Sequence, residues 1–378
     1  MSVTVQTNRF RDFLEGKDAF YSQSDYKEAT QKTLRQSDAL PAIYDASTES
    51  KAHRIIKEIL SYIVFPIAFY RLLQALIGKL GLLPSSSPDL FWYGANYADL
   101  QRRTICLTKE WKYKRFSIEV DGYTIDATIM GKPSTLNNKR WVLVTGGNGE
   151  FCEDKLQNNH FKYILSSLQG NALVFNYPGV GSSTGLPSKN AMVKAYNAML
   201  QFLEDKEHGI GAEQIIGYGY SIGGGVQGEA LKAHKLKEDV KYVFIKNRTF
   251  SSLSDEASAL MGSSFFGFLI KLFGWELDSV ESSRKLSAHE IVLQAANKKE
   301  FNAQCMHAQM TDRSHSIQIV GDGIIAARAS LAQALLNDPE CSMANKTIIA
   351  SPENHWSPLN SDLICFIAKT VHSKLGSV

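Results

Sequence analysis

GYGYSIGGG, at residues 217–225, places a serine between glycines directly after the short apolar run 214–216. In the G-x-S-x-G pattern formed by Gly219, Ser221 and Gly223, the chain turns sharply from a strand into a helix and exposes the serine hydroxyl. Glycines two residues before and after the serine remove Cβ atoms that would collide in so tight a turn. Glycine-rich strand ends are also common as purely structural turns. As a functional element, the pattern predicts that Ser221 is a nucleophile.

A serine nucleophile needs a base that takes its proton and a third group that orients this base. In folds with this turn, the order along the chain is serine, then a carboxylate, then histidine. The expected strand 316–320 is followed by Asp322, and the expected strand 346–350 by a turn-rich loop that contains His355. We therefore predict Asp322 as the acid and His355 as the base. Taken alone, each of these two residues is more simply explained as an ordinary polar loop residue. Their order along the chain and their positions after expected strands together favour the triad.

Other histidines and carboxylates fit these roles less well. His315 precedes the expected strand 316–320, and His372 lies in an expected terminal helix, so neither occupies a loop after a strand. Asp255 and Asp312 are the alternative acids.

Attack on a carbonyl also requires N–H donors for the oxyanion that forms, and loss of one donor commonly costs on the order of 3 kcal/mol of barrier. The first predicted donor is the backbone N–H of Ile222, next to the serine. The second is expected from the glycine loop 146–149, with Gly147 or Asn148 as the candidate. This loop follows the expected strand 141–145 and could equally be a simple turn from strand to helix.

The chain resembles an α/β-hydrolase over roughly residues 110–378. The likeness rests on an ordered set of motifs, which are VTGGNG at 144–149, FNYPGVGSSTG at 175–185, the serine turn at 217–225 and NRTFSSL at 247–253. Within that superfamily the chain is similar to the chlamydial 43-kDa virulence-associated protein family and to hydrolase-like effectors of Legionella, and more loosely to phosphatidylserine-lipase-type hydrolases. The resemblance implies ester or lipid hydrolysis by Ser221, Asp322 and His355. The loop Gly-Gly-Asn-Gly departs from the common His-Gly-Gly-Gly, which leaves the second oxyanion donor open.

Strands and helices are expected to alternate after residue 112. Two antiparallel strands are expected to turn at Asp121-Gly122. The expected strands are 115–120, 123–130, 141–145, 172–176, 214–219, 242–246, 316–320 and 346–350. This alternation predicts an α/β fold, in which a mostly parallel sheet is flanked by helices and the site lies at the carboxyl ends of the strands.

The alternation stops between about residues 254 and 313, where we expect a helical cap insertion over the site. An apolar stretch at 260–275 carries one charge, Lys271. As a lid over an acyl-binding cleft it would favour a lipid substrate, since burial of an acyl chain contributes ~0.8 kcal/mol per CH₂. The alternative is that these aromatic residues pack the core of the cap itself.

Residues 1–100 are expected to form a helical N-terminal extension before a hydrolase domain at 101–378. Apolar residues recur at helical spacing between 52 and 83, and no charge falls from Ile59 to Tyr70. This run is shorter than the ~20 apolar residues that a simple transmembrane span needs, and Pro66 interrupts it. Two alternatives remain, a helix packed on the hydrolase core or a membrane-interfacial segment at 55–83. The following stretch LPSSSP, at 83–88, is expected to be a linker.

Composition favours a globular protein with room for an appendage, since 44% of the 378 residues are hydrophobic and 21% are charged. A balance of 41 basic against 38 acidic residues, a net +3, argues against a nucleic-acid partner. Five widely spaced cysteines form no metal-binding pattern and favour a reducing compartment; no metal or cofactor is expected. The N-terminus lacks the pattern of a secretory signal, so we expect a cytoplasmic protein or delivery into a host cell by an unconventional route.

The sequence therefore predicts a serine hydrolase that cleaves an acyl ester, preferably of a lipid, through an acyl-enzyme on Ser221. One alternative is an acyltransferase with the same triad, because only the access of water or another acceptor separates the two reactions. The other is a non-catalytic protein of hydrolase fold that binds a host protein or a membrane.

Overall fold

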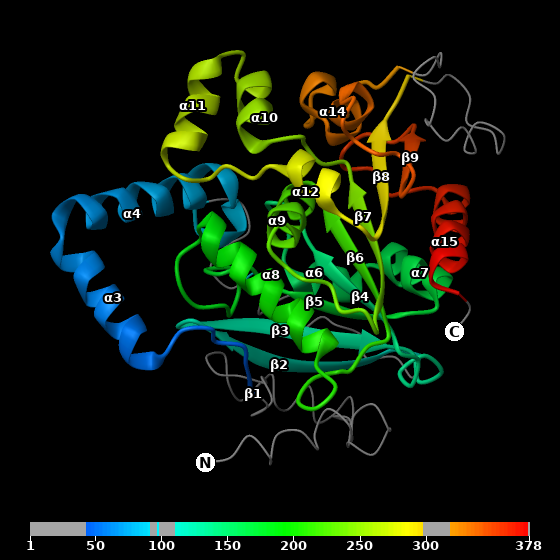
Figure 1. The fold of residues 1–378 in the computed structure, drawn as a ribbon, viewed down its shortest axis with the longest axis horizontal. Coiled ribbons are helices and arrows are strands. Elements are labelled where there is room, and N and C mark those ends of the chain that lie inside the picture. The colour runs from blue at the N-terminus through cyan, green and yellow to red at the C-terminus, as the bar shows by residue number, and fades with distance from the viewer. Residues whose placement is uncertain (1–42, 91–96, 98–109, 298–317, 377–378) are drawn as a thin grey trace. The chain divides into compact units, whose positions relative to one another are not determined.

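The computed structural model describes residues 43–90, 97, 110–297 and 318–376, whose contacts divide into two compact units. Of these residues, the first unit holds those up to 144 together with 148–165 and 169–213. The second unit holds 145–147, 166–168 and everything from 214 onward. Strands and helices alternate along most of the chain (Figure 1), as the sequence predicts.

The described part of the first unit contains a mixed sheet in the order β1-β2-β3-β5-β4. Its strands are β1 Ile43–Asp45, β2 Lys112–Val120, β3 Tyr123–Gly131, β4 Arg140–Thr145 and β5 Asn171–Phe175. β2 and β3 are antiparallel and turn at Asp121-Gly122, as predicted, where φ is 43° and 95°. β4 runs parallel to β5 and is buried along its whole length, which is typical of a strand covered on both faces.

The described part of the first unit also contains helices between these strands and after the last of them. They are α3 Lys51–Ile63, α4 Phe65–Ile77, a π-helix Gly78–Leu82, a 3-10 helix Pro84–Ser86, α6 Cys152–Gln157, α7 Asn159–Leu168, whose last residues belong to the second unit, and α8 Lys189–Glu204. α8 begins at Ser188, whose side chain accepts a hydrogen bond from the N–H of Ala191. Phe202 of α8 packs on Phe116 of β2 with ring centroids 4.8 Å apart, which ties the helix to the sheet.

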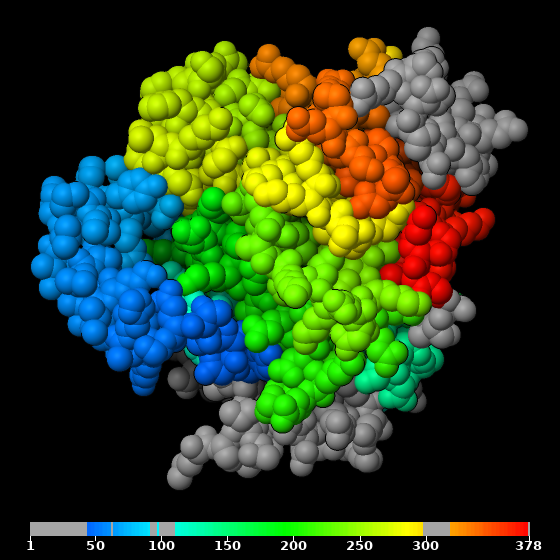
Figure 2. Space-filling view, viewed as in Figure 1, coloured from blue at the N-terminus to red at the C-terminus, as the bar shows by residue number. Residues whose placement is uncertain are grey.

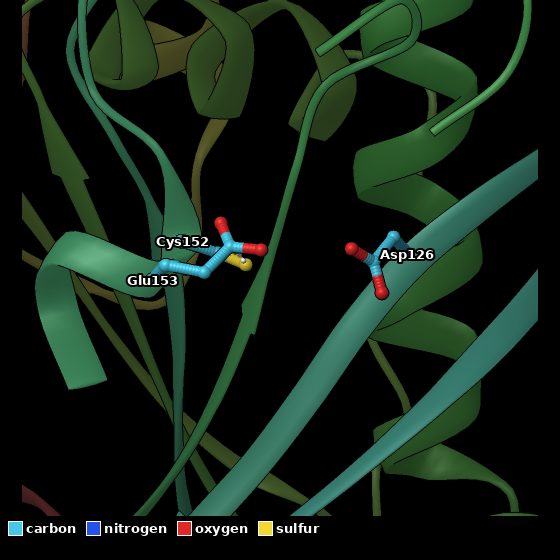
Figure 3. A group of neighbouring side chains, drawn as sticks. All are labelled: Asp126, Cys152 and Glu153. Atoms are coloured by element: carbon cyan, nitrogen blue, oxygen red, sulfur yellow. Dashed lines mark hydrogen bonds between the residues drawn. The ribbon is translucent and has the colours of Figure 1, made fainter. Parts of the chain in front are cut away.

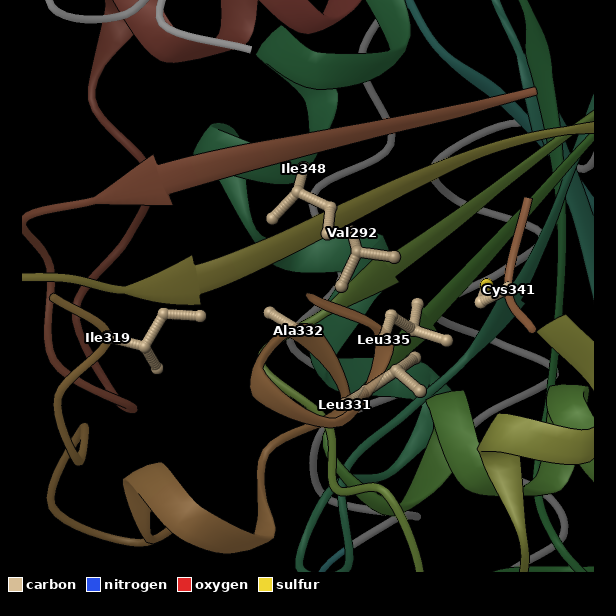
Figure 4. Packing of buried hydrophobic residues seen from close by; sticks show 7 residues of the cluster. All are labelled: Val292, Ile319, Leu331, Ala332, Leu335, Cys341 and Ile348. Carbon is tan, nitrogen blue, oxygen red and sulfur yellow. The ribbon is translucent and has the colours of Figure 1, made fainter. Parts of the chain in front are cut away.

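The second unit is built on parallel strands in the order β6-β7-β8-β9. These are β6 Gln214–Tyr220, β7 Lys241–Asn247, β8 His289–Ala295 and β9 Lys346–Ser351. The helices are α9 Ile222–Leu231, α10 Leu253–Leu260, α11 Ser264–Leu272, α12 Ser279–Lys285, a 3-10 helix Ala327–Ala329, α14 Leu331–Asn337 and α15 Ser361–Leu375. Figure 4 shows Leu331 and Leu335 of α14 packed toward Val292 of β8 and Ile348 of β9, which buries this side of the sheet.

Three charged residues on neighbouring strands are buried together in the second unit. Lys246 and Glu290 are fully buried and their side chains lie 2.8 Å apart, while Lys346 lies 3.5 Å from the other oxygen of Glu290. Burial alone would raise the pKa of Glu290, but Lys246 and Lys346 hold this pKa below its usual value. The network therefore fixes β7, β8 and β9 side by side through groups that are costly to bury unpaired.

One predicted strand is wrong in its described part. Ile319 forms only an isolated bridge with Ala296, while residues 316–317 lie outside the described part of the chain. β8 holds the place between β7 and β9 instead, and it lies within the stretch 254–313 that we expected to be a cap. The sequence does not reveal β8 because this strand begins with two polar residues, His289 and Glu290. Glu290 is compatible with a buried strand only because Lys246 and Lys346 on the neighbouring strands pair with it.

The segment expected as a linker is packed. Leu83 and Ser85 are fully buried, and the Ser85 hydroxyl donates to the backbone carbonyl of Asn148 at 3.0 Å. By contrast, α3 and α4 (blue in Figures 1 and 2) leave most of their apolar side chains exposed. These exposed apolar side chains do not pack on the hydrolase core.

Candidate active site

Ser221 stands at the junction of β6 and α9 in a backbone conformation that non-glycine residues seldom adopt, with φ 54° and ψ −124°. Three hydrogen bonds hold it there. Its N–H donates to the carbonyl of Asn247 at 3.0 Å, and its carbonyl accepts from the N–H of Gly224 at 3.0 Å and from the hydroxyl of Thr249 at 2.8 Å. A Cβ at Gly219 would lie 2.7 Å from the Cα of Gly224, so the tight turn requires the glycine that the sequence supplies.

The structure brings Ser221, Asp322 and His355 together within the second unit. The Nε2 atom of His355 lies 3.0 Å from Oγ of Ser221, and its Nδ1 atom lies 2.9 Å from Oδ2 of Asp322. All three are buried: Ser221 is 7% exposed, His355 is 5% exposed and Asp322 is 2% exposed. These contacts fit the tautomer in which Nδ1–H donates to the carboxylate and Nε2 accepts from the hydroxyl. An imidazole held in this way can take the serine proton.

The Asp322 carboxylate is fixed by its own loop. Its Oδ1 atom accepts from the N–H groups of Ile324 at 3.0 Å and Ile325 at 2.7 Å, which leaves Oδ2 for the imidazole. The backbone carbonyl of Asp322 accepts from the N–H of His355 at 2.8 Å, so the two loops are joined through main chain as well as side chain. The residues just before Asp322 form no regular strand, and Asp322 lies in the loop that follows them.

Two residues to which the sequence assigned no role, Arg248 and Tyr220, position the loop that carries His355. Arg248 is buried, has φ 49°, and donates from Nη1 to the backbone carbonyls of Asn354 and Ser357. The hydroxyl of Tyr220 donates to the backbone carbonyl of His355, and the Arg248 guanidinium lies 5.6 Å from the centre of the Tyr220 ring. Tyr220 is the last residue of β6 and Arg248 directly follows β7. No spacing in the sequence indicates that either residue reaches a loop more than 100 residues away.

Two of the three predicted oxyanion donors lie in the same unit as the serine. Ile222 is the first residue of α9, where backbone N–H groups point out of the helix end and favour negative charge. A Cβ at Gly223 would lie 2.4 Å from the carbonyl oxygen of Thr145 and 2.7 Å from that of Gly146, so the loop that continues to Gly147 passes directly against this helix end. Asn148 belongs to the first unit, where its carbonyl accepts from Ser85.

A further buried carboxyl group lies close to Asp322. Glu256 of α10 is 5% exposed and accepts from the N–H of Ala326 at 3.1 Å, in the loop that carries Asp322. Burial first, and then the charge of Asp322, raise the pKa of Glu256 to about 7, although the N–H of Ala326 opposes this rise. Glu256 thus connects a helix of the expected cap to the acid loop, and nothing in its sequence context predicted this.

Of the rival candidates, His372 and Asp255 lie in the described part of the chain, and neither shares this geometry. The Nε2 atom of His372 lies 3.0 Å from the backbone carbonyl of Ser167, and Asp255 is exposed on α10. His315 and Asp312 lie outside the described residues.

A second buried polar cluster occurs in the first unit, where Asp126, Cys152 and Glu153 bring ligand-type atoms within 4.8 Å of one another (Figure 3). Their residue types could hold a metal ion. The amide nitrogen of Asn176 donates to Glu153 at 3.1 Å and to Asp126 at 3.4 Å, and its oxygen accepts from the N–H of Cys152 at 2.9 Å. Arg115 donates to Asp126 at 2.6 Å. These bonds join β3, the end of β5 and the start of α6 into one polar network.

The helices α10 and α11 have both buried and exposed apolar residues. Ile270 is 7% exposed and Trp275 is fully buried, as expected if the cap packs its own core. Five others are 51–59% exposed, namely Leu260, Met261, Phe265, Phe268 and Leu272. Packing within this segment, 253–275, therefore accounts for only part of its apolar composition.

Comparison with known proteins gives the same fold. The family model described as Chlamydia CHLPS protein (DUF818) matches residues 20–376. Protein bem46 of Schizosaccharomyces pombe is 25% identical over 214 residues, 55% of this chain and 69% of its own length. The alpha/beta hydrolase domain-containing protein WAV2 of Arabidopsis thaliana is 31% identical over 100 residues, 26% of this chain and 31% of its own. A solved esterase of Pyrococcus furiosus superposes with a TM-score of 0.50 at 11% identity, over 71% of this chain and 93% of the esterase. The chain has the α/β-hydrolase fold, with a mostly parallel sheet flanked by helices.

Proposed function

Because this chain belongs to the Chlamydia CHLPS protein family (DUF818) and has the α/β-hydrolase fold, we propose that it is a serine hydrolase that cleaves an acyl ester through an acyl-enzyme on Ser221. The fold and the relatives support a hydrolase in general terms. The observation that supports the serine mechanism is the continuous series of hydrogen bonds from Ser221 through His355 to Asp322, at 3.0 and 2.9 Å.

In the first half of the proposed reaction, Oγ of Ser221 attacks the ester carbonyl while Nε2 of His355 takes the hydroxyl proton. Asp322 accepts from Nδ1–H, holds this tautomer and stabilises the imidazolium that forms. The carbonyl oxygen becomes an oxyanion, which the N–H of Ile222 and that of Gly147 or Asn148 would bind. The C–O bond to the leaving alcohol then breaks, and His355 returns the proton to the alcohol.

In the second half, water attacks the acyl-enzyme. His355 takes a proton from the water, the oxyanion forms again, and the bond from Ser221 to the acyl carbon breaks as the proton passes to Oγ. The products are a carboxylic acid and the free enzyme. If an alcohol or amine takes the place of water, the same steps yield an acyltransferase, so the acceptor alone separates the two reactions.

We favour a lipid as the substrate because of the cap helices. Phe265, Phe268 and Leu272 recur at i, i+3 and i+7 on α11 and are 51–57% exposed, so they present one apolar stripe. An acyl chain covered by such a stripe would contribute ~0.8 kcal/mol per buried CH₂.

Hydrolysis rates on p-nitrophenyl esters of increasing acyl-chain length test this preference for a lipid. We expect Phe268→Ser to lower the rate on long esters and leave acetate hydrolysis unchanged, and equal losses on all esters would contradict the lid.

Labelling with a fluorophosphonate probe tests the serine mechanism directly. The parent protein should be labelled on Ser221, and Ser221→Ala should lose both the label and ester hydrolysis. Ser373→Ala changes an exposed serine on α15 and should behave as the parent. If the parent protein is not labelled, the non-catalytic alternative is the better account.

A further inference from the structure

The two consecutive helices α3 and α4 present a row of large apolar side chains to solvent. Seven of them are between 51% and 76% exposed, namely Ile56, Ile59, Leu60, Ile63, Phe65, Phe69 and Leu72. In Figure 2 the two helices form one continuous surface. Contiguous apolar surface of this kind is uncommon on proteins that are covered only by water, and it usually marks a place where another apolar surface binds.

The orientation of α3 is the reverse of that of an ordinary surface helix. Its apolar residues at 55, 56, 59, 60 and 63 share an arc of about 140°, and in a soluble protein this arc would face the core. Here the polar arc makes the contacts with the first unit instead. Lys57 pairs with Glu49 at 3.0 Å, the Arg54 side chain lies against Gly122 of the β2–β3 turn, and Ser61 is only 8% exposed. The apolar arc is thereby directed away from the unit.

A side-chain hydrogen bond joins α3 to α4. The guanidinium of Arg71 on α4 donates to the hydroxyl of Ser61 on α3, which braces the two helices against each other. Pro66 lies in the first turn of α4, where its fixed φ suits the start of a helix. Phe65 and Phe69 stack with ring centroids 6.1 Å apart, so the aromatic side chains at this corner form a single apolar surface.

Charge indicates which kind of partner covers this surface. Residues 51–82 contain five basic side chains, Lys51, Arg54, Lys57, Arg71 and Lys79, and one acidic side chain, Glu58, a net charge of 5 − 1 = +4. A second copy of the chain would bring the same positive charge to the contact. A bilayer with anionic head groups offers both an apolar interior and negative charge.

We propose that α3 and α4 bind the surface of an anionic lipid bilayer, with their apolar arcs in the acyl region and with Lys51 and Lys79, at the two ends of the segment, near the head groups. Phe65–Leu82 is long and apolar enough to cross a membrane on length and composition, and only 11% of it is buried. The helices lie along the interface rather than across it, because α3 is amphipathic and because Arg71 and Lys79 interrupt the apolar run. Binding to the bilayer does not require Ser221.

Vesicle flotation of the full chain tests the proposal, with vesicles of phosphatidylcholine alone and vesicles of phosphatidylcholine and phosphatidylserine in equal parts. The parent protein should float with the second kind and much less with the first. Ile59→Asp with Phe69→Asp should lower binding by at least about tenfold. The matched pair Ile59→Leu with Phe69→Leu keeps the apolar character and should bind as the parent. Circular dichroism shows whether each variant is folded.

Charge reversal forms the second arm of the test. Lys51→Glu with Lys79→Glu should lower binding to phosphatidylserine vesicles by about tenfold or more. Lys369→Glu with Lys374→Glu makes the same change in net charge on the exposed side of α15 and should bind as the parent. Bound protein should be released by a wash at alkaline pH, since it does not span the bilayer.

Four results would overturn the proposal. Failure of the parent protein to float would mean that other residues of the chain or a soluble partner cover the apolar arcs. Resistance to the alkaline wash would indicate a spanning helix. A dimer in lipid-free solution that Ile59→Asp with Phe69→Asp dissociates, without vesicle binding by the parent, would assign the surface to a second copy. Equal flotation of the aspartate and leucine pairs would place the contact elsewhere.

Hydrolysis of a soluble ester is measured separately from vesicle flotation. Loss of the proposed enzyme activity would therefore not change the flotation results.

Discussion

The guanidinium of Arg248 donates to the backbone carbonyl of Ser357 at 2.9 Å, and the same nitrogen also donates to the carbonyl of Asn354. His355 and Trp356 lie between these two carbonyls in the sequence, so one side chain closes the loop that carries the imidazole. Arg248 adopts a φ of 49°, a conformation that costs of order 1 kcal/mol and persists only where surrounding bonds hold it.

We expect Arg248→Lys to lower kcat on a soluble ester by roughly tenfold to a hundredfold, because one ammonium group cannot reach both the two loop carbonyls and the Asn247 side chain, to which Nε donates at 3.0 Å. Small displacements of a reacting group are costly. KM should change little, since Arg248 positions His355 and does not touch the substrate. Steady-state kinetics and the rate of fluorophosphonate labelling check this. Arg284→Lys, at a half-exposed arginine, is the matched control. If both variants keep parental kcat, the bonds to the loop do not position the imidazole.

Asp322→Asn should lower kcat by roughly 10⁴ while the fold is retained. The asparagine amide can donate toward Nδ1 and so favours the tautomer in which Nε2 carries the proton and cannot accept from Ser221. Kinetics on a soluble ester measure the effect, with circular dichroism as a check of folding. Asp362→Asn, in the exposed first turn of α15, should have parental activity. A loss of less than about tenfold in Asp322→Asn would show that another group orients the imidazole.

Gly223→Ala should destabilise the protein by about 1–3 kcal/mol, because a core that is already filled has no room for a methyl group. The new Cβ would meet the carbonyl oxygens of Thr145 and Gly146 at 2.4 and 2.7 Å, so the loop toward Gly147 must move. Activity should fall with stability if this loop supplies an oxyanion donor. Urea denaturation and kinetics measure the two effects. Gly81→Ala, where the added Cβ meets nothing within 4 Å, is the control and should change neither.

Glu256 should make the stability of the protein depend on pH. Its pKa is raised from 4.5 to about 7 in the folded state, so between these values the folded protein binds more protons than the unfolded chain. The free energy of unfolding should therefore fall as pH rises from about 4.5 to 7, by up to about 3 kcal/mol from this group. Glu256→Gln keeps an acceptor for the N–H of Ala326 but removes the titration. Denaturation at a series of pH values should show a smaller decline in Glu256→Gln, and an unchanged decline would show that Glu256 is ionised throughout.

Local patterns in the sequence were sufficient for much of the fold. The turn at Ser221 depends on glycines two residues away, and the hairpin at Asp121-Gly122 depends on adjacent residues, so both are readable from short segments. The predicted strands that became β4, β5, β6, β7 and β9 are short apolar runs bounded by turn residues. β8 could not be recognised, because Glu290 is tolerated inside the sheet only through Lys246 and Lys346 on other strands.

The sequence by itself determined the order of serine, carboxylate and histidine, the turn that exposes the serine, and the class of fold, because each of these follows from residue types at short range. Only the tertiary structure decided that His355 lies 3.0 Å from a serine 134 residues earlier, that Arg248 holds its loop, and that α3 directs its apolar arc outward. These features depend on which surfaces meet after the chain has folded. Contact between distant segments is set by packing of the whole unit, and no periodicity within one segment contains it.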